Sequence, residues 1–242
     1  MNRYDIQDRV KYWIKTQLDH YPEAYMQFLH YKYKNHRFAP YLVSKSTNIV
    51  IEGFPRSANS FAVRAFNALQ EPSQLKVATH VHSPSQIICG IKKGIPTLVL
   101  IRKPDECLIS LKALNHEYHE KYKDRYPYVE GFNHLAKYYI NFYKRLEPYY
   151  GDIVVSDFKR TINNFESVIR QINNRFNTSF NNTGLTEEKK KHIFNNFGFH
   201  LSPSTNRNKL KERLRKEFEE NCKSEFKEKM HEIYTKVCKY SI

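Results

Sequence analysis

The spacing of apolar residues predicts helices in several parts of the chain. Between Ile6 and Leu29 apolar residues recur at helical spacing, which predicts one or two amphipathic helices broken near Pro22. The same spacing predicts a helix at Phe165–Phe176. The tail Lys209–Lys239 carries many Glu and Lys residues four positions apart, a pattern typical of a solvated helix with one apolar stripe.

Short runs of aliphatic and β-branched residues predict four strands between these helices. Their expected bounds are Asn48–Glu52, Leu75–His80, Thr97–Ile101 and Asp152–Ser156. We expect helices from Ser60 and from Pro104, because a proline suits the first position of a helix. Strands that alternate with helices predict an α/β fold with a parallel sheet flanked by helices.

Three loops follow the predicted strands and are the first candidates for a functional site. They are Phe54–Ser60, His80–Pro84 and Arg102–Ser110. In open parallel sheets, ligands bind beyond the carboxyl ends of the strands, so these loops are expected to lie together.

Length and composition agree with a folded α/β domain. The chain has 242 residues, of which 40% are apolar and 27% charged, and this excludes a disordered chain. We expect a single domain, 1–242, with N-terminal helices (1–45), an α/β core (46–180) and a C-terminal loop and helical segment (181–242). There is no apolar run of the ~18 residues needed to span a bilayer, and no secretory leader or CxxC pair, so we expect a soluble, cytoplasmic protein.

The charge balance indicates an anionic partner. Lys and Arg number 40 against 25 Asp and Glu, which gives a formal net charge of +15. A basic excess of this size predicts affinity for nucleic acid, anionic lipid, phosphorylated cofactors or acidic glycans, and does not choose among them.

The segment GFPRSANS between the first strand and its helix resembles a phosphate-binding loop. Gly53 and Ser60 fit the ends of the Walker A frame, whereas Ala58 replaces its second glycine and Asn59 its lysine. The cation lies three residues earlier, at Arg56. Backbone N–H groups and the helix dipole still favour an anion at such a loop, but the missing lysine disfavours Mg-ATP hydrolysis. These residues alone leave a plain β-turn-α connection open.

Three segments together resemble a known family, the sulfotransferases that use 3′-phosphoadenosine 5′-phosphosulfate (PAPS). GFPRSANSF resembles the family's 5′-phosphosulfate loop, YPKSGTTW, and RKPDECLIS resembles its 3′-phosphate motif, RNPxDxxxS, with Arg102 and Ser110 in frame. ATHVHSP is similar to the KTHLP block, and His80 takes the position of the catalytic histidine. The resemblance is strong over Ile49–Leu111.

The chain departs from the family pattern at identifiable places. Arg56 replaces the loop lysine and Ala58 the usual glycine, and Val155 takes the place of the aromatic residue in the family's YED element. The C-terminal RKGxxGDW block is not found; the nearest cationic substitute is SPSTNRNKLK, with Arg207 and Lys209.

The resemblance implies a P-loop NTPase-like sulfotransferase fold and a PAPS-dependent transferase activity. Such an enzyme moves the sulfuryl group from PAPS to an acceptor hydroxyl or amine by in-line displacement, without a metal, and releases adenosine 3′,5′-bisphosphate (PAP). We expect PAPS as cofactor and no metal site. The acceptor is not identified; the basic surface suits an anionic or glycan acceptor, and nucleic acid is not the expected partner.

The resemblance also assigns roles to individual residues. His80 is expected to be the catalytic base and Arg56 to stabilise charge on the bridging oxygen. Expected cofactor-binding residues are Arg56, Ser57, Ala58, Asn59, Ser60, Phe61, Arg102, Ser110 and Arg207. Expected acceptor-binding residues are His82, Tyr118 and Tyr122.

Two other functions remain open at this point. A P-loop-like nucleotide or nucleoside kinase would explain a phosphate loop, but the Walker lysine is missing. A basic nucleic-acid-binding module would explain the charge of +15 and the 14% aromatic residues, but not two phosphate motifs in frame.

Overall fold

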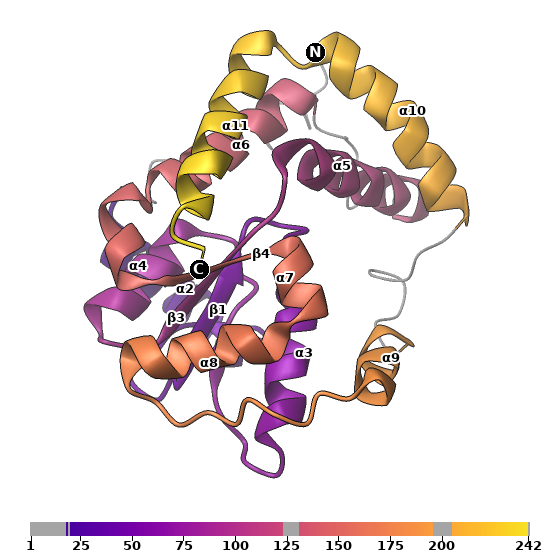
Figure 1. Cartoon of the computed structure of the whole chain (residues 1–242). Helices are drawn as coiled ribbons and strands as arrows, with labels where there is room; N and C mark the ends of the chain where they lie inside the picture. Colours follow the sequence, from indigo (N-terminus) through magenta and orange to yellow (C-terminus); the bar gives the residue numbers. More distant parts are fainter. Residues whose placement is uncertain (1–17, 19, 123–130, 196–204, 242) are drawn as a thin grey trace.

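Four short parallel strands form the centre of the molecule in a computed structural model, which describes residues 18, 20–122, 131–195 and 205–241 (Figure 1). The strands lie in the order β2-β1-β3-β4. Their bounds are β1 Ile49–Gly53, β2 Val77–Ala78, β3 Thr97–Ile101 and β4 Val154–Asp157. Every strand pair is parallel, with Gly53 opposite Leu100. The predicted single α/β domain with a parallel sheet flanked by helices is therefore confirmed.

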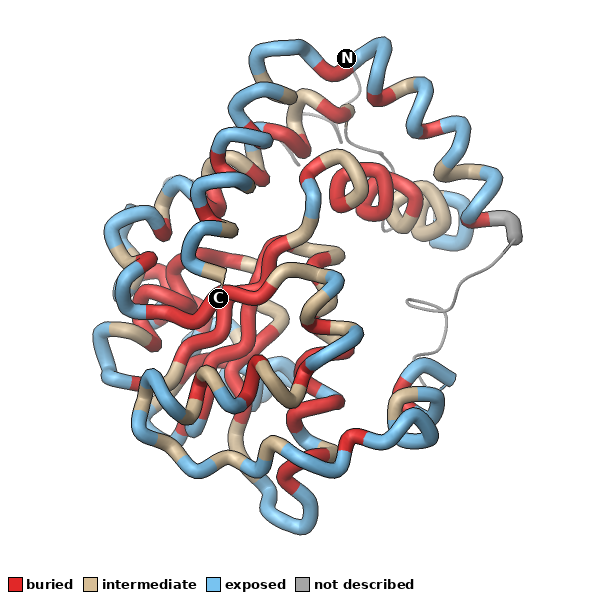
Figure 2. The backbone as a smooth tube through the Cα atoms, viewed as in Figure 1, coloured by how far each residue is buried: buried red, intermediate tan, exposed pale blue. Residues whose placement is uncertain are grey.

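Side chains of alternate strand residues enter two separate cores, one on each face of the sheet. On one face Ile51 and Leu98 pack against α3 (Asn59–Gln70) and α8 (Phe165–Phe176). On the other face the core, which includes Val50 and Val99, is covered mainly by helices (Figures 1 and 2). They include α2 Pro22–Lys32, α4 Pro84–Lys92, α5 Pro104–Lys121, α6 Phe132–Lys144 and α11 Ser224–Cys238. Burial on both faces explains why the strands are continuously apolar rather than alternating.

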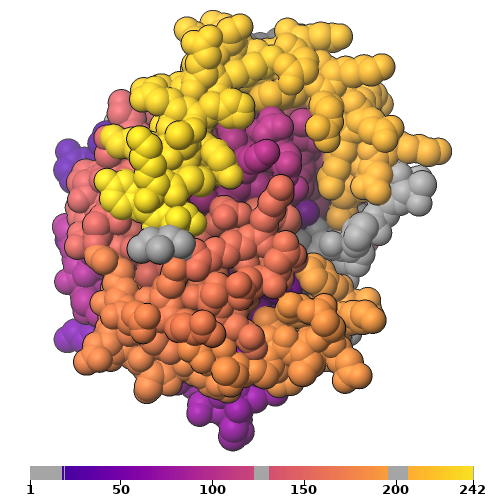
Figure 3. All heavy atoms as spheres, in the orientation of Figure 1, coloured from indigo at the N-terminus to yellow at the C-terminus, as the bar shows by residue number. Residues whose placement is uncertain are grey.

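The remaining elements lie around this core. They are the 3-10 turns η1 Ala39–Tyr41 and η2 Glu147–Asp152, and the helices α7 Phe158–Asn163, α9 Glu187–Asn195 and α10 Thr205–Asn221. Helix α10 packs on α5 and contributes Leu214 and Phe218 to the same core, and in the space-filling view α5 is visible between α10 and α11 (Figure 3). Within the described parts of the chain, no helix combines the length and the apolar character needed to cross a membrane.

Several predicted elements differ from the observed ones. Helix α8 has the predicted bounds, but the second strand is shorter than predicted, because His80 adopts a left-handed backbone conformation (φ 60°). The predicted tail helix is two helices, α10 and α11, separated near Cys222. Helices α4 and α6 were not predicted. The N-terminal part of the first predicted helix, before Leu18, lies outside the described residues.

Candidate functional site

The phosphate loop begins where two strands approach each other too closely for a side chain. A Cβ atom at Gly53 would lie 2.4 Å from the carbonyl oxygen of Leu100 on β3. No real Cβ tolerates that distance, so glycine is required there. The loop Phe54–Ala58 therefore leaves the sheet directly beside the end of β3, which continues into Arg102.

The phosphate loop folds around the carbonyl group of Phe54. The backbone N–H of Ser57 and the side-chain amide of Asn59 both donate to this oxygen, at 3.2 and 3.0 Å. Arg56 and Ala58 are in the left-handed region, with φ of 75° and 74°. That conformation costs a residue with a side chain roughly 1–2 kcal/mol, so the loop stores backbone strain. The side chain of Asn59 thus secures the loop.

Helix α3 presents its N-terminus at the end of this loop. Ala58 is the residue before its first turn, and the N–H groups of Asn59, Ser60 and Phe61 belong to that turn, where no intrahelical partner exists. Together with the helix dipole they favour an anion. The N–H of Ser57 is already used within the loop. The ring of Phe61 is buried against Phe194, so only its backbone can face a ligand.

The residues expected at the two phosphates of PAPS meet at Arg56. The Nε group of Arg56 donates to the hydroxyl of Ser110 at 3.1 Å, and Nη1 of Arg102 donates to the backbone oxygen of Arg56 at 3.4 Å. Arg102 also stacks on the ring of Phe158 at 4.1 Å and pairs with Glu106 at 3.3 Å. The fold therefore brings together two motifs that are separated by about fifty positions in the sequence.

Helix α10 adds two further cations to this group. Arg207 is 4% exposed and its Nε donates to Glu117 of α5 at 2.8 Å. Burial, then the charges of Arg207 and Arg102, lower the pKa of Arg56 to about 10. Burial and the same arginine charges also lower the pKa of Lys211. We call Arg56, Arg102, Arg207 and Lys211 the cationic cluster.

The cationic cluster carries more positive than negative charge. Glu117 is the carboxylate whose charge acts in the opposite direction on both Arg56 and Lys211, and it is already paired with Arg207. Burial is the larger cause of the lowered pKa values of Arg56 and Lys211, and repulsion between neighbouring cations adds to it. A bound polyanion would relieve that repulsion, and its phosphate oxygens suit the guanidinium donors present.

The predicted catalytic histidine lies between two hydroxyl groups. The Nε2 atom of His80 is 3.0 Å from the hydroxyl of Ser60, and Nδ1 is 3.0 Å from that of Thr79. Burial lowers the pKa of His80, and the charges of His82 and Arg64 act in the same direction, whereas Glu52 raises it. The lowered pKa favours the neutral imidazole, which is the form that can accept a proton.

The buried carboxylate of Glu52 organises the loop that carries both histidines. Its Oε2 atom accepts hydrogen bonds from the N–H groups of Val81 and His82, at 2.9 and 3.2 Å, and from the amide of Gln86 at 3.1 Å. Its Oε1 atom lies 3.3 Å from Nδ1 of His82. Burial alone would raise the pKa of Glu52, but the hydrogen bond and charge of His82 outweigh it and lower the pKa.

Backbone strain is concentrated in this part of the molecule. Among the described residues, five positions other than glycine have positive φ: Arg56, Ala58, His80, His82 and Asn177. The first four lie in the phosphate loop and the histidine loop, and Asn177 ends helix α8. Strained backbone is retained where the surrounding structure holds it, and it often accompanies a functional site.

The other predicted acceptor residues lie at the C-terminal end of α5. The rings of Tyr118 and Tyr122 have centroids 6.1 Å apart, and Tyr122 is 41% exposed. Their role in acceptor binding stays a prediction. Glu52, Glu117 and Lys211 were not predicted as site residues from the sequence. Glu52 gave a signal, as a charged residue at the end of an otherwise apolar strand.

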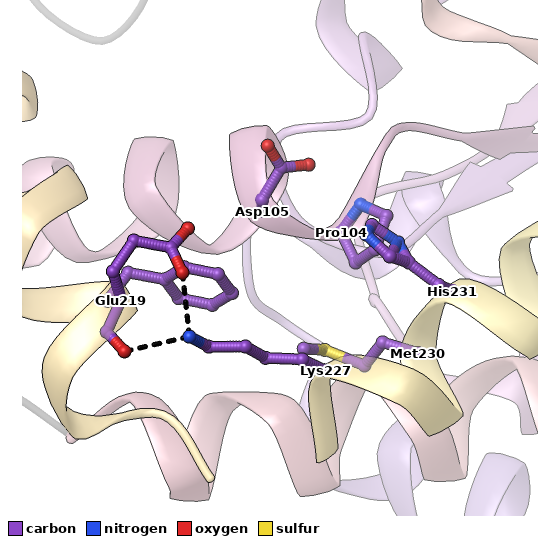
Figure 4. Close-up of a pocket in the computed structure, with 7 residues that line it drawn as sticks. Pro104, Asp105, Glu219, Lys227, Met230 and His231 are labelled. Carbon is purple, nitrogen blue, oxygen red and sulfur yellow. Dashed lines mark hydrogen bonds and ion pairs between the residues drawn. The ribbon is translucent and has the colours of Figure 1, made fainter. Parts of the chain in front are cut away.

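A pocket elsewhere contains none of the predicted site residues. It lies between α5, α10 and α11 and is lined by Pro104, Asp105, Phe218, Glu219, Lys227, Met230 and His231 (Figure 4). Lys227 spans its edge and donates to the backbone and the carboxylate of Glu219, at 2.8 and 2.7 Å. In the part of the chain that the structure describes, no three His, Cys, Asp or Glu side chains are grouped to hold a metal.

Comparison with solved structures shows a distant similarity in fold. No protein-family model and no curated protein sequence matches the chain. Among solved structures, the chain is similar to the mouse sulfotransferase SULT7A1 complexed with PAP, with a TM-score of 0.44 and 10% sequence identity. The match covers 79% of this chain and 90% of the mouse chain. A similarity this distant assigns neither a family nor an activity.

Proposed function

We propose that the protein is a PAPS-dependent sulfotransferase that transfers the sulfuryl group to an acceptor hydroxyl or amine and releases PAP. The observation that carries this proposal is the cationic cluster beside the N-terminus of α3, because it unites the two predicted phosphate motifs with two further cations from α10. PAPS presents two separated groups of negative charge, and the cluster offers guanidinium donors to both.

The donor-side residues have distinct roles in this proposal. The N–H groups at the start of α3 bind the 5′-phosphate, and Arg56 stabilises the charge that grows on the bridging oxygen as the sulfur–oxygen bond breaks. Arg102 and Ser110 bind the 3′-phosphate. The hydrogen bond from Arg56 to Ser110 links the two subsites, so that both phosphates are held by one connected group of donors. Arg207 and Lys211 supply additional positive charge.

His80 acts as the base on the acceptor side. In this arrangement Nδ1–H donates to Thr79, and Nε2 is left to accept a proton where it now contacts Ser60. The acceptor oxygen forms a bond to sulfur while its proton passes to Nε2, and the electron pair of the broken bond leaves with PAP. This displacement needs no metal to bridge two phosphates, since the leaving group is the 5′-phosphate itself.

Thermal unfolding with a ligand panel tests the proposal. PAP, PAPS, ATP and AMP are compared with and without Mg²⁺ or EDTA. PAP at 100 times its dissociation constant should stabilise the fold by about 2.7 kcal/mol in EDTA. Arg102→Ala should weaken PAP binding by roughly 1.5–3 kcal/mol, the scale of a charged hydrogen bond, and adenosine 5′-phosphosulfate far less.

Two results would contradict the proposal. A larger shift with Mg-ATP than with PAP would favour a nucleotide kinase. Steep salt-dependent affinity for DNA or RNA without any PAP shift would favour a nucleic-acid-binding module. Equal losses of PAP and adenosine 5′-phosphosulfate binding in Arg102→Ala would remove Arg102 from the 3′-phosphate. The variant Lys216→Met, at an exposed position of α10, serves as the matched control for lost surface charge.

A further inference from the structure

Exposed aromatic rings gather in the segment that precedes the sheet. Of the eight large apolar side chains that are exposed among the described residues, five lie between positions 21 and 41: Tyr21, Phe28, Tyr31, Phe38 and Tyr41. Single exposed aromatic residues are ordinary, but a contiguous group usually marks a binding surface. The rings of this group that approach the histidine loop are the ones that could contact a ligand bound beside His80.

A continuous series of ring contacts leads from the surface to His80. The ring of His36 stacks on Phe38 with centroids 5.0 Å apart. Phe38 contacts Tyr41 at 6.2 Å, and Tyr41 contacts His80 at 6.1 Å. We call His36, Phe38 and Tyr41 the aromatic ledge. Phe38 and Tyr41 are 39% and 41% exposed, so the ledge is open to solvent up to the predicted base.

The backbone holds the aromatic ledge in fixed register with the histidine loop. Tyr41 ends the 3-10 turn η1, and its carbonyl accepts a hydrogen bond of 2.9 Å from the N–H of Thr79. Thr79 is the residue before His80 and bonds to its ring. The position of Tyr41 relative to His80 is therefore set by the main chain and does not depend on the ring contact alone.

Positive charge accompanies the rings. The guanidinium of Arg37 lies 5.3 Å from the ring centre of Phe38, and the ammonium of Lys32 lies 5.2 Å from that of Tyr33. Both cations are on exposed residues. A ligand on the ledge would therefore meet flat apolar surface and positive charge together, as an acidic chain with apolar faces requires.

We propose that the aromatic ledge binds an acidic polysaccharide and presents one of its hydroxyl groups to His80. The proposal rests on the proposed function, and names its acceptor class. Pyranose rings carry C–H groups on their faces, which the electron-rich faces of aromatic rings attract, and uronic carboxylates pair with Arg37 and Lys32. Every sugar also brings hydroxyl groups, the nucleophile that the reaction uses.

The geometry favours a sugar chain over two other ligands. Small apolar ligands bind in enclosed pockets, whereas Tyr41 and Phe38 are open to solvent. Successive nucleic-acid bases stack in parallel on parallel rings, but the planes of Phe38 and Tyr41 differ by 53° and those of Tyr41 and His80 by 55°. Sugar C–H groups tolerate such tilts, because they contact each ring separately.

Calorimetric binding without PAPS tests the proposal. The probes are hyaluronan, which is an unsulfated chain of alternating uronic acid and amino sugar, neutral dextran, and single-stranded RNA. Hyaluronan should bind more tightly than dextran. Tyr41→Ala and Phe38→Ala should each weaken hyaluronan binding about tenfold, the effect of losing a contact worth 1.4 kcal/mol. Tyr31→Ala, at an 84% exposed position of α2, should change it less than twofold.

The outcomes separate this proposal from the proposed function. A PAP-induced thermal shift that is unchanged in Tyr41→Ala shows that the variant is folded and its donor site intact; if that variant does not fold, Phe38→Ala carries the test. Equal binding of hyaluronan and dextran would overturn the proposal that the ledge binds an acidic polysaccharide. Equal losses of hyaluronan affinity in Tyr31→Ala and Tyr41→Ala would overturn it as well. Preferred binding of RNA with loss in Tyr41→Ala would replace the sugar by a nucleic acid. If hyaluronan binding is lost in Tyr41→Ala but PAP causes no thermal shift, the ledge binds the polysaccharide and the proposed sulfotransferase function is refuted.

Discussion

The cationic cluster and the histidine loop lie at the same edge of the sheet, but their charges are arranged in opposite ways. In the cluster, burial and then the charges of neighbouring cations lower the pKa values of Arg56 and Lys211. In the histidine loop, the buried carboxylate of Glu52 is surrounded by hydrogen-bond donors and by His82, which together hold its pKa low. Like charges therefore repel one another in the cationic cluster, whereas the charged group of the histidine loop lies beside its own partner.

This difference indicates which side of the site needs a ligand. The histidine loop is electrostatically complete in the free protein, so it is positioned before any ligand arrives. The cationic cluster keeps an excess of positive charge after Glu117 has paired with Arg207, so we expect an anion to offset the remaining repulsion. The predictions that follow change one side at a time.

The largest expected effect follows removal of His80, the proposed base. His80→Ala should lower turnover by roughly 10²–10⁴-fold, the usual contribution of general-base catalysis. PAP affinity should change little, because the proposed role of His80 is on the acceptor side. His82→Ala should mainly raise the acceptor's Michaelis constant. Transfer from [³⁵S]PAPS to an identified acceptor, with PAP binding measured in parallel, checks both variants. Retained turnover in His80→Ala with loss in His82→Ala would reverse their roles.

Neutralising Glu52 should destabilise the histidine side. Glu52→Gln replaces a buried acceptor of several hydrogen bonds by a group that also donates, and leaving buried donors unsatisfied costs roughly 1–3 kcal/mol. The folded-state pKa of Glu52 is lowered, so its charge contributes stability above its ordinary pKa, and this contribution disappears as the pH falls through the folded value. Urea unfolding of both proteins should therefore give a difference that shrinks in acid. A constant difference would contradict this linkage.

Neutralising Lys211 should stabilise the free protein, the opposite of the effect of Glu52→Gln, and should be the smallest of the three effects. Lys211→Met should raise the stability of the free protein by less than about 1 kcal/mol, since Lys211 is only partly buried and solvent screens its repulsion. Its lowered pKa means that the charge costs stability at neutral pH; this cost decreases as the pH rises above the folded value and is gone above the ordinary pKa of lysine. The variant should also reduce the thermal shift with PAP, unlike Lys216→Met. If Lys211→Met were less stable than the original protein in the absence of ligand, the idea that cations repel one another in the cluster would be contradicted.

The parts of the fold with strong local signals could be predicted from the sequence. The strand Thr97–Ile101 and the helix Phe165–Phe176 have the predicted bounds, because an apolar run and an amphipathic spacing define them locally. Helix α4 was missed although Ser83 and Pro84 give a start signal: the Ser83 hydroxyl accepts from the N–H of Ser85. Helix α6 was missed as well. Its Tyr139 and Tyr143 are buried with their hydroxyls donating to backbone carbonyls, which sequence spacing does not reveal.

The candidate site also contains residues that the sequence predicted and residues that it did not. The motifs located Arg56, Arg102 and His80, but long-range packing determines which side chains join them. Lys211 lies in the cationic cluster only because α10 packs on α5. No local sequence pattern distinguishes it from the other lysines of that helix. Left-handed backbone at Ala58 was equally hidden, since alanine rarely adopts it. The resemblance indicated the position through the family's glycine, and the structure supplies the physical reason.

Helix α10 has a consequence for the rate at which a bound nucleotide leaves. Arg207 and Lys211 reach the cluster from a helix that packs on α5 and is joined to it by the ion pair between Lys112 and Glu217. Under the proposed function, a nucleotide bound by Arg56 on one side and by α10 on the other would act as a reversible cross-link between distant parts of the chain. Product release would then require α10 to separate locally from α5, and the lifetime of the PAP complex would follow the strength of that helix contact.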